Sequence, residues 1–278
     1  MKKKGIIYIL LSALFFSIMA AFVKSVPELP LTEKMFFRNM VGLIAVSFTV
    51  YRKKINLKPQ KPTLMFLRSL FGLIGVGLYY AALERLPLAN AVILNKLSPF
   101  FVMVFAVFFL KEKVNRPQKV ALLIAIVGAL FVVRPSLDYS LLPGVLGLLS
   151  AAFAGAAYTV IRKLTAYDPP ILIVFYFCLF SSVVLLPFMV IEGFVVPDVT
   201  ELMSLLGIGV SALIAQLFMT NAYQYAPASE LSIYSYSDII FSFMIGLVVW
   251  FELPDVLSLF GGVLIVLGGI VNYMNSRK

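Results

Sequence analysis

Ten apolar stretches constrain this chain more than any other feature of its sequence. Each is close to the length of about 20 residues that an α-helix needs to cross a bilayer. They cover residues 5–23, 32–51, 63–83, 88–110, 118–133, 142–161, 171–191, 202–223, 229–251 and 256–274. The linkers between them are short and hold most of the prolines and charges, so no soluble domain fits between the stretches. The pattern predicts an all-α polytopic membrane protein with ten transmembrane helices.

The composition excludes several classes of protein. Hydrophobic residues make up 62% of the 278 residues and charged residues only 13%, whereas soluble domains have about 45–50% and about 25%. A soluble enzyme, a disordered chain and a disulfide scaffold are therefore excluded. Histidine is absent and Cys178 is the single cysteine, so no histidine metal site can form. Metalloprotease, hydrolase and Walker A motifs are also missing, and we expect no catalysis, no cofactor and no ATP hydrolysis.

The basic residues indicate how the chain lies in the membrane. The net charge is +10, and most Lys and Arg residues fall at 2–4, 52–61, 111–119, 162–163 and 277–278. These segments alternate with acidic loops, so the positive-inside rule places both termini in the cytoplasm. The alternation also argues against nucleic acid as a partner, because it builds no single basic patch. Residues 1–23 could alternatively be a signal peptide cleaved near Ala20, but we expect a retained span in a bacterial-type inner membrane.

A faint internal repeat relates the two halves of the chain. An offset of 140 residues aligns Pro87 with Pro227 and Glu112 with Glu252, at the start and end of the fourth and ninth spans. It divides the chain into residues 1–139 and 140–278, with five spans in each part. Because five is an odd number, two copies in one chain must have opposite orientations in the membrane. Inverted repeats of this kind are typical of secondary transporters, which bind substrate near the midplane.

Several motifs follow one another in an order that resembles a known family. They are Ala-Leu-Phe-Phe-Ser at 13–17 running to Lys24, Arg38, Ala-Ala-Leu at 81–83 through Pro87 to Ala-Asn-Ala at 89–91, Pro99, Leu-Lys-Glu-Lys at 110–113, Trp-Phe-Glu at 250–252, and the glycines at 128, 261–262 and 268–269. The chain resembles the EamA-type members of the drug/metabolite transporter superfamily over nearly its whole length. One departure is Ile239, where the repeat would place a counterpart of Pro99. The resemblance implies ten helices, a central cavity and transport of a small metabolite, often export.

Three ionisable residues lie deep within predicted spans, where charge is costly. The helical rise places Lys96 roughly 13 Å and Asp238 about 14 Å from the outer face, near the midplane. One interpretation is that this pair binds opposite charges of a zwitterionic substrate, with Asp238 also able to load a proton. Alternatively, the two residues form an ion pair that only fixes the helices, or Lys96 extends outward to the membrane surface. Arg38, at roughly 10 Å depth, suits surface extension, a gate pair with Glu33 or Glu84, or substrate contact.

Polar residues recur at equivalent points of the two halves. Asn95 and Lys96 align with Ser235 and Tyr236 at the 140-residue offset, and this coincidence marks a candidate site. The predicted substrate-binding residues are Lys96, Asp238, Asn95, Tyr234, Tyr80, Tyr158, Tyr176 and Asn221, with Tyr79 and Gln216 as further candidates. Arg38 and Glu230 are candidates for a gate or coupling role, although a charge placed favourably at a helix N-terminus is the preferred interpretation of Glu230. The small-residue stretches at 151–157 and 261–269 favour close helix packing.

The sequence thus predicts a secondary-active transporter of a small polar or amphipathic metabolite, such as an amino acid or a related compound. We expect an exporter that works by alternating access, with the bilayer and a small molecule as partners and a proton as a candidate coupling ion. The alternatives are a transporter of a larger cationic or nucleoside-like metabolite, a structural or assembly membrane protein without a substrate, and an intramembrane enzyme. The sequence leaves the substrate, the direction, the coupling ion and the choice between monomer and homodimer open.

Overall fold

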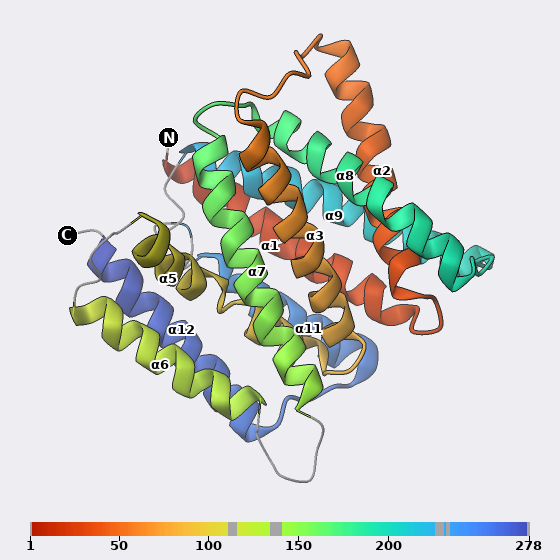
Figure 1. Ribbon diagram of the computed structural model, residues 1–278. Helices are drawn as coiled ribbons and strands as arrows, with labels where there is room; N and C mark the ends of the chain where they lie inside the picture. Colours follow the sequence, from red (N-terminus) through yellow and green to blue (C-terminus); the bar gives the residue numbers. More distant parts are fainter. Residues whose placement is uncertain (1, 111–115, 134–140, 226–230, 232–233, 277–278) are drawn as a thin grey trace.

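The computed structural model describes residues 2–110, 116–133, 141–225, 231 and 234–276. The described residues form helices and connecting segments, with no strand among them. The helices are α1 (Lys2–Ser25), α2 (Leu31–Arg52), α3 (Pro62–Leu83), α4 (Leu88–Asn95), α5 (Ser98–Leu110), α6 (Arg116–Val133), α7 (Leu142–Leu164), α8 (Pro170–Glu192), α9 (Val199–Tyr225), α11 (Ser237–Trp250) and α12 (Val256–Ser276). Figure 1 shows them as one bundle with short connections.

Within the described residues, eight helical segments are long and apolar enough to cross a membrane, and Ser237–Trp250 is a shorter apolar helix. The protein is therefore an all-helical multi-pass membrane protein. The second predicted span, α2, is not among the eight, because Glu33, Lys34 and Arg38 lie in its first two turns. The prediction of one continuous helix over residues 88–110 is corrected: these residues form two helices, α4 and α5.

Proline positions set many of the helix starts. Pro30, Pro87 and Pro169 are the residues immediately before α2, α4 and α8, and Pro62 opens α3. Proline suits these positions because the first N–H groups of a helix have no partner within the helix. At the other end of α8, Gly193 takes φ +89°, a left-handed conformation that glycine adopts without steric cost.

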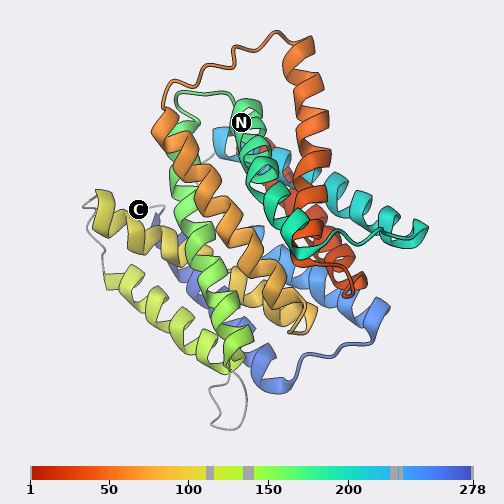
Figure 2. The same cartoon turned by 45° about the vertical axis from the view of Figure 1, so that its right-hand side comes forward.

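Helices from the two halves of the chain pack against one another. α1 lies along α9, α3 along α7, α2 along α8, and α6 along α12, and Figure 2 shows the α6–α12 pair at one edge of the bundle. A Cβ atom at Gly128 would lie 2.7 Å from the Gly261 carbonyl oxygen, and one at Gly261 would lie 2.5 Å from the Gly128 carbonyl oxygen. The backbones of α6 and α12 can therefore touch only because both residues are glycine.

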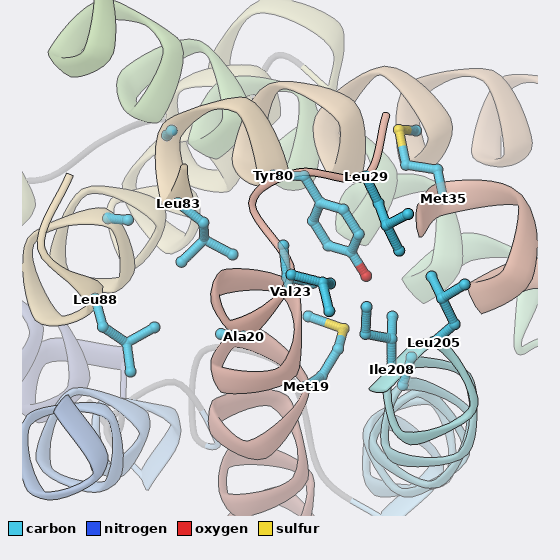
Figure 3. Packing of buried hydrophobic residues seen from close by; sticks show 14 of the residues in the cluster. Met19, Ala20, Val23, Leu29, Met35, Tyr80, Leu83, Leu88, Leu205 and Ile208 are labelled. Atoms are coloured by element: carbon cyan, nitrogen blue, oxygen red, sulfur yellow. The ribbon is translucent and has the colours of Figure 1, made fainter. Parts of the chain in front are cut away.

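We call the side of the bundle that holds the first turn of α1 and the last turn of α12 the terminal side, and the opposite side the far side (Figure 1). A cluster of buried hydrophobic side chains fills the far side, and we name it the far-side cluster. It includes Met19, Ala20, Val23, Leu29, Met35, Tyr80, Leu83, Leu88, Leu205 and Ile208. Figure 3 shows these side chains meeting between α1, α3, α4 and α9.

Candidate functional site

The helix that would form the fourth span is interrupted where Lys96 lies. α4 ends at Asn95 and α5 begins at Ser98, so Lys96 and Leu97 form a turn between them. Pro99 accounts for the break, because it has no N–H to donate to the Asn95 carbonyl and its ring would collide with that carbonyl in a continuous helix. The turn places the Lys96 ammonium at the interior of the bundle instead of at a helix end.

A second break lies at the equivalent point of the other half. Tyr236 is a turn residue immediately before α11, with helical residues Tyr234 and Ser235 preceding it. Ile239 cannot cause this break as Pro99 does. Instead, Tyr236 is held by close packing on α12, since a Cβ at Gly269 would lie only 2.3 Å from its ring. The second interruption therefore occurs without a proline at the equivalent position, at a residue whose ring packs closely on α12.

The two breaks bring together the oppositely charged groups that the sequence placed at one depth. The Lys96 Nζ lies 2.6 Å from Asp238 Oδ2, so the two residues form a direct ion pair. Ser17 of α1 donates a hydrogen bond to the other carboxylate oxygen, Oδ1, and Ser242 donates to the Ser17 hydroxyl at 3.0 Å. Asp238 is 4% exposed, and both of its carboxylate oxygens have a partner.

This ion pair lines a cavity of about 310 Å³, within the range of about 300–1,000 Å³ that is usual for small-molecule sites. Tyr80, Lys96 and Asp238 are among the residues that line it. Its lining also includes Gln118 and Arg162, in the first turn of α6 and the last turn of α7. The cavity therefore extends from the interior of the bundle toward the terminal side.

The cavity brings together most of the residues expected in a binding site. Lys96, Asp238, Asn95, Tyr80, Tyr158 and Arg38 all line it, together with Tyr79 and Gln216. Asn95 also donates a hydrogen bond through Nδ2 to the Ser150 hydroxyl at 3.1 Å, which ties α4 to α7.

Three expected residues are not part of the cavity lining. Tyr176 donates its hydroxyl to the Leu57 carbonyl at 2.6 Å, which holds the segment between α2 and α3. Asn221 donates to the Leu217 carbonyl of its own helix at 2.7 Å, and the Tyr234 ring packs edge-on against Tyr273. Glu230, the second candidate for a gate or coupling role, lies outside the described residues.

Arg38 is buried and faces the cavity rather than the membrane surface. It is 5% exposed, its Nη1 donates to Asn39 Oδ1 at 3.1 Å, and its guanidinium carbon lies 5.3 Å from the centre of the Phe177 ring. A gate pair with Glu84 does not form, because Glu84 pairs with Lys34 at 2.7 Å.

Sequence reasoning missed Arg68, Ser17 and Tyr223. Arg68 lies on α3, is 2% exposed and lines the cavity, as does Tyr223. Arg68 is only six residues beyond the start of α3, a position that suggests a side chain reaching back to the membrane surface. The signal that could have revealed it is Gly72, one turn further along the same helix, which leaves room for a side chain that folds inward.

Polar contacts and the far-side cluster close the other end of the cavity. Lys24 at the end of α1 forms an ion pair with Glu252, and Glu252 also accepts a hydrogen bond from the Leu88 backbone N–H at 3.1 Å. The Lys24 Nζ donates to the Leu86 carbonyl at 3.2 Å and lies over the Trp250 ring. These contacts join α1, the start of α4 and the end of α11 on the far side.

The known proteins that this chain is similar to include several transporters. The EamA-like transporter family matches residues 3–134 and again residues 142–274. The chain is 36% identical to the pseudopaline exporter of Pseudomonas aeruginosa, over 96% of this chain and 95% of that protein. It is 27% identical to the S-adenosylmethionine uptake transporter of Rickettsia conorii, over 84% of this chain and 80% of that one. Human solute carrier family 35 member G1 is 27% identical, over 96% and 78%.

A solved crystal structure has the same fold, with a TM-score of 0.73 at 18% identity and full coverage of both chains. The helical bundle, the central cavity and these relatives define a membrane transporter of small metabolites and not an enzyme. The chain belongs to the EamA-like transporter family, within the drug/metabolite transporter superfamily.

Proposed function

We propose that this protein is a secondary-active exporter of a small polar metabolite, such as an amino acid or a related compound, and that it works by alternating access. The observation that carries the proposal is the Lys96–Asp238 ion pair. It lies at two helix breaks and lines a cavity of suitable size. Interrupted transmembrane helices of this kind form the substrate sites of many secondary transporters.

The helix packing supports an arrangement of two inverted repeats, residues 1–139 and 140–278. If the halves are equivalent, the contact between α1 and α9 should have a counterpart between α7 and α3, and it does. The contact between α1 and α11 likewise corresponds to the contacts of α7 with α4 and α5. The pairs α2–α8 and α6–α12 each join two helices that are counterparts of one another. Rocking of one half against the other would then expose the same site to either side of the membrane.

In this mechanism the ion pair is the resting form of the binding site. Without substrate, Lys96 and Asp238 neutralise each other, and their attraction offsets much of the cost of removing both charges from water. A zwitterionic substrate would separate them, with its carboxylate on the Lys96 ammonium and its amino group on the Asp238 carboxylate. Asn95, Tyr80 and Tyr158 would supply polar and aromatic contacts around it. Proton uptake by Asp238 would release Lys96, which makes a proton the leading candidate for the coupling ion.

The charge distribution supports export from the cytoplasm across a bacterial inner membrane. Basic residues gather on the terminal side, at 52–61 and 162–163, so the positive-inside rule makes this side cytoplasmic. The cavity extends toward the same side, and its far side is closed. This form would load substrate from the cytoplasm. One relative is an exporter and another an uptake transporter, so the direction needs its own test.

The alternatives fit the site less well. A cationic or nucleoside-like substrate would suit Asp238 and the tyrosines, but Arg38 and Arg68 add positive charge to the same cavity. A structural protein without a substrate would be expected to have a cavity too narrow for a solute, and this cavity is large enough for one.

The test is flux in reconstituted vesicles loaded with a panel of radiolabelled amino acids and related compounds. We expect wild type to release at least one compound faster than empty vesicles. Asp238→Asn and Lys96→Met should abolish that flux, while Glu28→Gln and Lys119→Met, which change exposed charges outside the cavity, should keep it. Flux that survives in both cavity variants would move the site elsewhere. A complete absence of flux across the panel would refute the proposed substrate class.

A further inference from the structure

Two deeply buried arginines gather around one aromatic ring inside the cavity. Arg38 of α2 is 5% exposed and Arg68 of α3 is 2% exposed, and both line the cavity. The Arg38 guanidinium carbon lies 5.3 Å from the centre of the Phe177 ring, and that of Arg68 lies 4.3 Å from it. Both guanidinium groups therefore contact the same aromatic ring, Phe177 on α8.

Neither arginine has a negatively charged partner among the described residues. The ion pairs there involve Lys24, Lys34, Arg85 and Lys96. The Nε atoms of Arg38 and Arg68 are buried without an acceptor, and the amide of Asn39 is neutral. Asp238, the carboxylate that lines this cavity, already binds Lys96 and Ser17. The cavity thus carries two positive charges that the described residues leave unbalanced.

Such an arrangement is costly unless an anion completes it. A buried charge loses its hydration, and a neutral ring restores only part of that stabilisation. Two like charges in a region of low dielectric also repel each other. A guanidinium presents N–H donors in a planar fork that matches the oxygens of a carboxylate or phosphate group. An anion between Arg38 and Arg68 would remove both penalties.

The backbone of α3 makes room for this arrangement. A Cβ atom at Gly72 would lie 2.1 Å from Arg68 Nη1 and 2.9 Å from the Phe177 ring. Any other residue at position 72 would push the guanidinium away from the ring. The glycine therefore holds Arg68 in the cavity, which distinguishes it from an arginine that merely happens to lie near the membrane surface.

We propose that Arg38 and Arg68 form the anion-binding part of the transport site, and that the substrate is a dianionic metabolite with two carboxylate groups or a phosphate group. This rests on the proposed function and narrows its substrate class. The Lys96–Asp238 pair is neutral as a unit, so a substrate that balances the arginines carries about two negative charges beyond any zwitterionic part. Tyr158 also lines the cavity.

The test measures binding to the purified full-length chain at constant ionic strength. The probes are acetate, succinate, citrate, inorganic phosphate and glycerol 3-phosphate, with succinamide as an uncharged analogue. We expect one dianion class to raise the melting temperature of wild type, and acetate and succinamide to leave it unchanged. Arg38→Gln and Arg68→Gln should weaken binding of that dianion at least about 30-fold, the loss typical of removing one partner of a buried charge pair.

Arg52→Gln is the matched control, because Arg52 also lies on α2 and over a phenylalanine, Phe48, but is exposed outside the cavity. It should bind the dianion as wild type does. A second measurement needs no ligand: removing an unbalanced buried charge should raise the melting temperature of Arg68→Gln above that of wild type. A lower value, no stabilisation by any dianion, or equal stabilisation of wild type and both glutamine variants would overturn the proposal.

The choice of dianion and the flux assay separate the remaining possibilities. Stabilisation by succinate and citrate assigns the site to carboxylates, and stabilisation by phosphate and glycerol 3-phosphate assigns it to phosphate groups. Dianions that bind through the arginines but are not moved by vesicles would leave the anion site standing and refute dianions as the transported substrate. Flux of a neutral or cationic compound that is unchanged in Arg38→Gln and Arg68→Gln would leave transport standing and refute the anion site.

Discussion

At the scale of single residues, the Lys96–Asp238 pair explains how the membrane interior accommodates two charges. Each charge would be costly alone, and together they satisfy each other while Ser17 binds the remaining carboxylate oxygen. A pair of this kind does not by itself stabilise a protein, because desolvation offsets most of the attraction. Its presence in a cavity is better explained by what the two groups bind when they separate.

This account predicts strong coupling between the two positions. Lys96→Met and Asp238→Asn should each destabilise the protein, Lys96→Met by about 3–5 kcal/mol because it leaves a buried carboxylate unpaired. The double variant should be more stable than the sum of the two single losses implies. The measurement is a double-mutant cycle on the free energy of unfolding in detergent.

The same cycle on Arg85 and Glu84 serves as a control, because that pair is longer, at 3.9 Å, and Arg85 is exposed. Its coupling should not exceed about 1 kcal/mol. Equal coupling in the two cycles would show that Lys96 and Asp238 do not form the buried pair described here.

Single residues also show which features of the site can be predicted from the sequence. Depth along a helix can be counted from the sequence, so Lys96 and Asp238 were correctly expected at one level. Rotation about the helix axis cannot be counted, because neighbouring helices set it. Tyr176 was therefore expected in the cavity but bonds to Leu57, and Arg68 was missed because its inward direction depends on Gly72 and on Phe177 of another helix.

At the scale of helices, the interruption between α4 and α5 positions the Lys96 ammonium. The sequence predicts apolar stretches well, because a bilayer demands a fixed length of apolar helix. It predicts breaks only where a residue such as Pro99 causes them. The break at Tyr236 has no such residue beside it, and the Tyr236 ring packs against Gly269, a contact between separate helices that no local pattern reveals.

Restoring the missing donor at the first break should impair transport. In Pro99→Ala, an N–H becomes available to the Asn95 carbonyl, so α4 and α5 can join into one helix and carry Lys96 away from Asp238. We expect flux to fall about tenfold, the effect of roughly 1.4 kcal/mol on the transport barrier, while the melting temperature stays the same or rises. Flux in vesicles and thermal unfolding measure the two effects.

Pro117→Ala is the appropriate comparison for this variant. Pro117 lies in the first turn of α6, where a helix N–H has no partner to lose. It should retain full flux. If Pro99→Ala also retains full flux, the interruption does not position the site.

The close crossing of α6 and α12 gives a second prediction at this scale. In Gly128→Ala, the new methyl carbon would lie 2.7 Å from the Gly261 carbonyl oxygen. This oxygen belongs to the backbone, which cannot move aside as a side chain can. We expect a loss of about 1–3 kcal/mol in the free energy of unfolding. Gly246→Ala should be tolerated, because the nearest atom to its Cβ would be 3.7 Å away. Equal stability of the two variants would mean that α6 and α12 are not held at this distance.

At the scale of the whole molecule, the proposed alternating-access mechanism makes this structure one state of a transport cycle. The cavity lining reaches the terminal side. On the far side lie the far-side cluster (Figure 3) and the Lys24–Glu252 ion pair. Polar contacts join α1, the start of α4 and the end of α11 on this side, so we expect an opening on the far side to break them. Glu252 occupies a central position among these contacts, because it binds both Lys24 and the Leu88 N–H.

Removing the Glu252 charge should therefore shift the protein toward a state that opens on the far side. A reporter cysteine at Val76, which lines the cavity, can be modified by a membrane-impermeant thiol reagent after the native Cys178 is replaced by alanine. With Glu252 intact, we expect modification mainly from the terminal side. Glu252→Gln should raise the rate of modification from the far side about tenfold, which corresponds to a loss of roughly 1.4 kcal/mol from the closed state.

Arg85→Gln is the control. It removes an exposed charge on the same side and should change neither rate of modification. Because a ligand or a mutation moves such an equilibrium only through its different effect on the two states, an unchanged far-side rate in Glu252→Gln would mean that the ion pair persists in both states and does not form the gate.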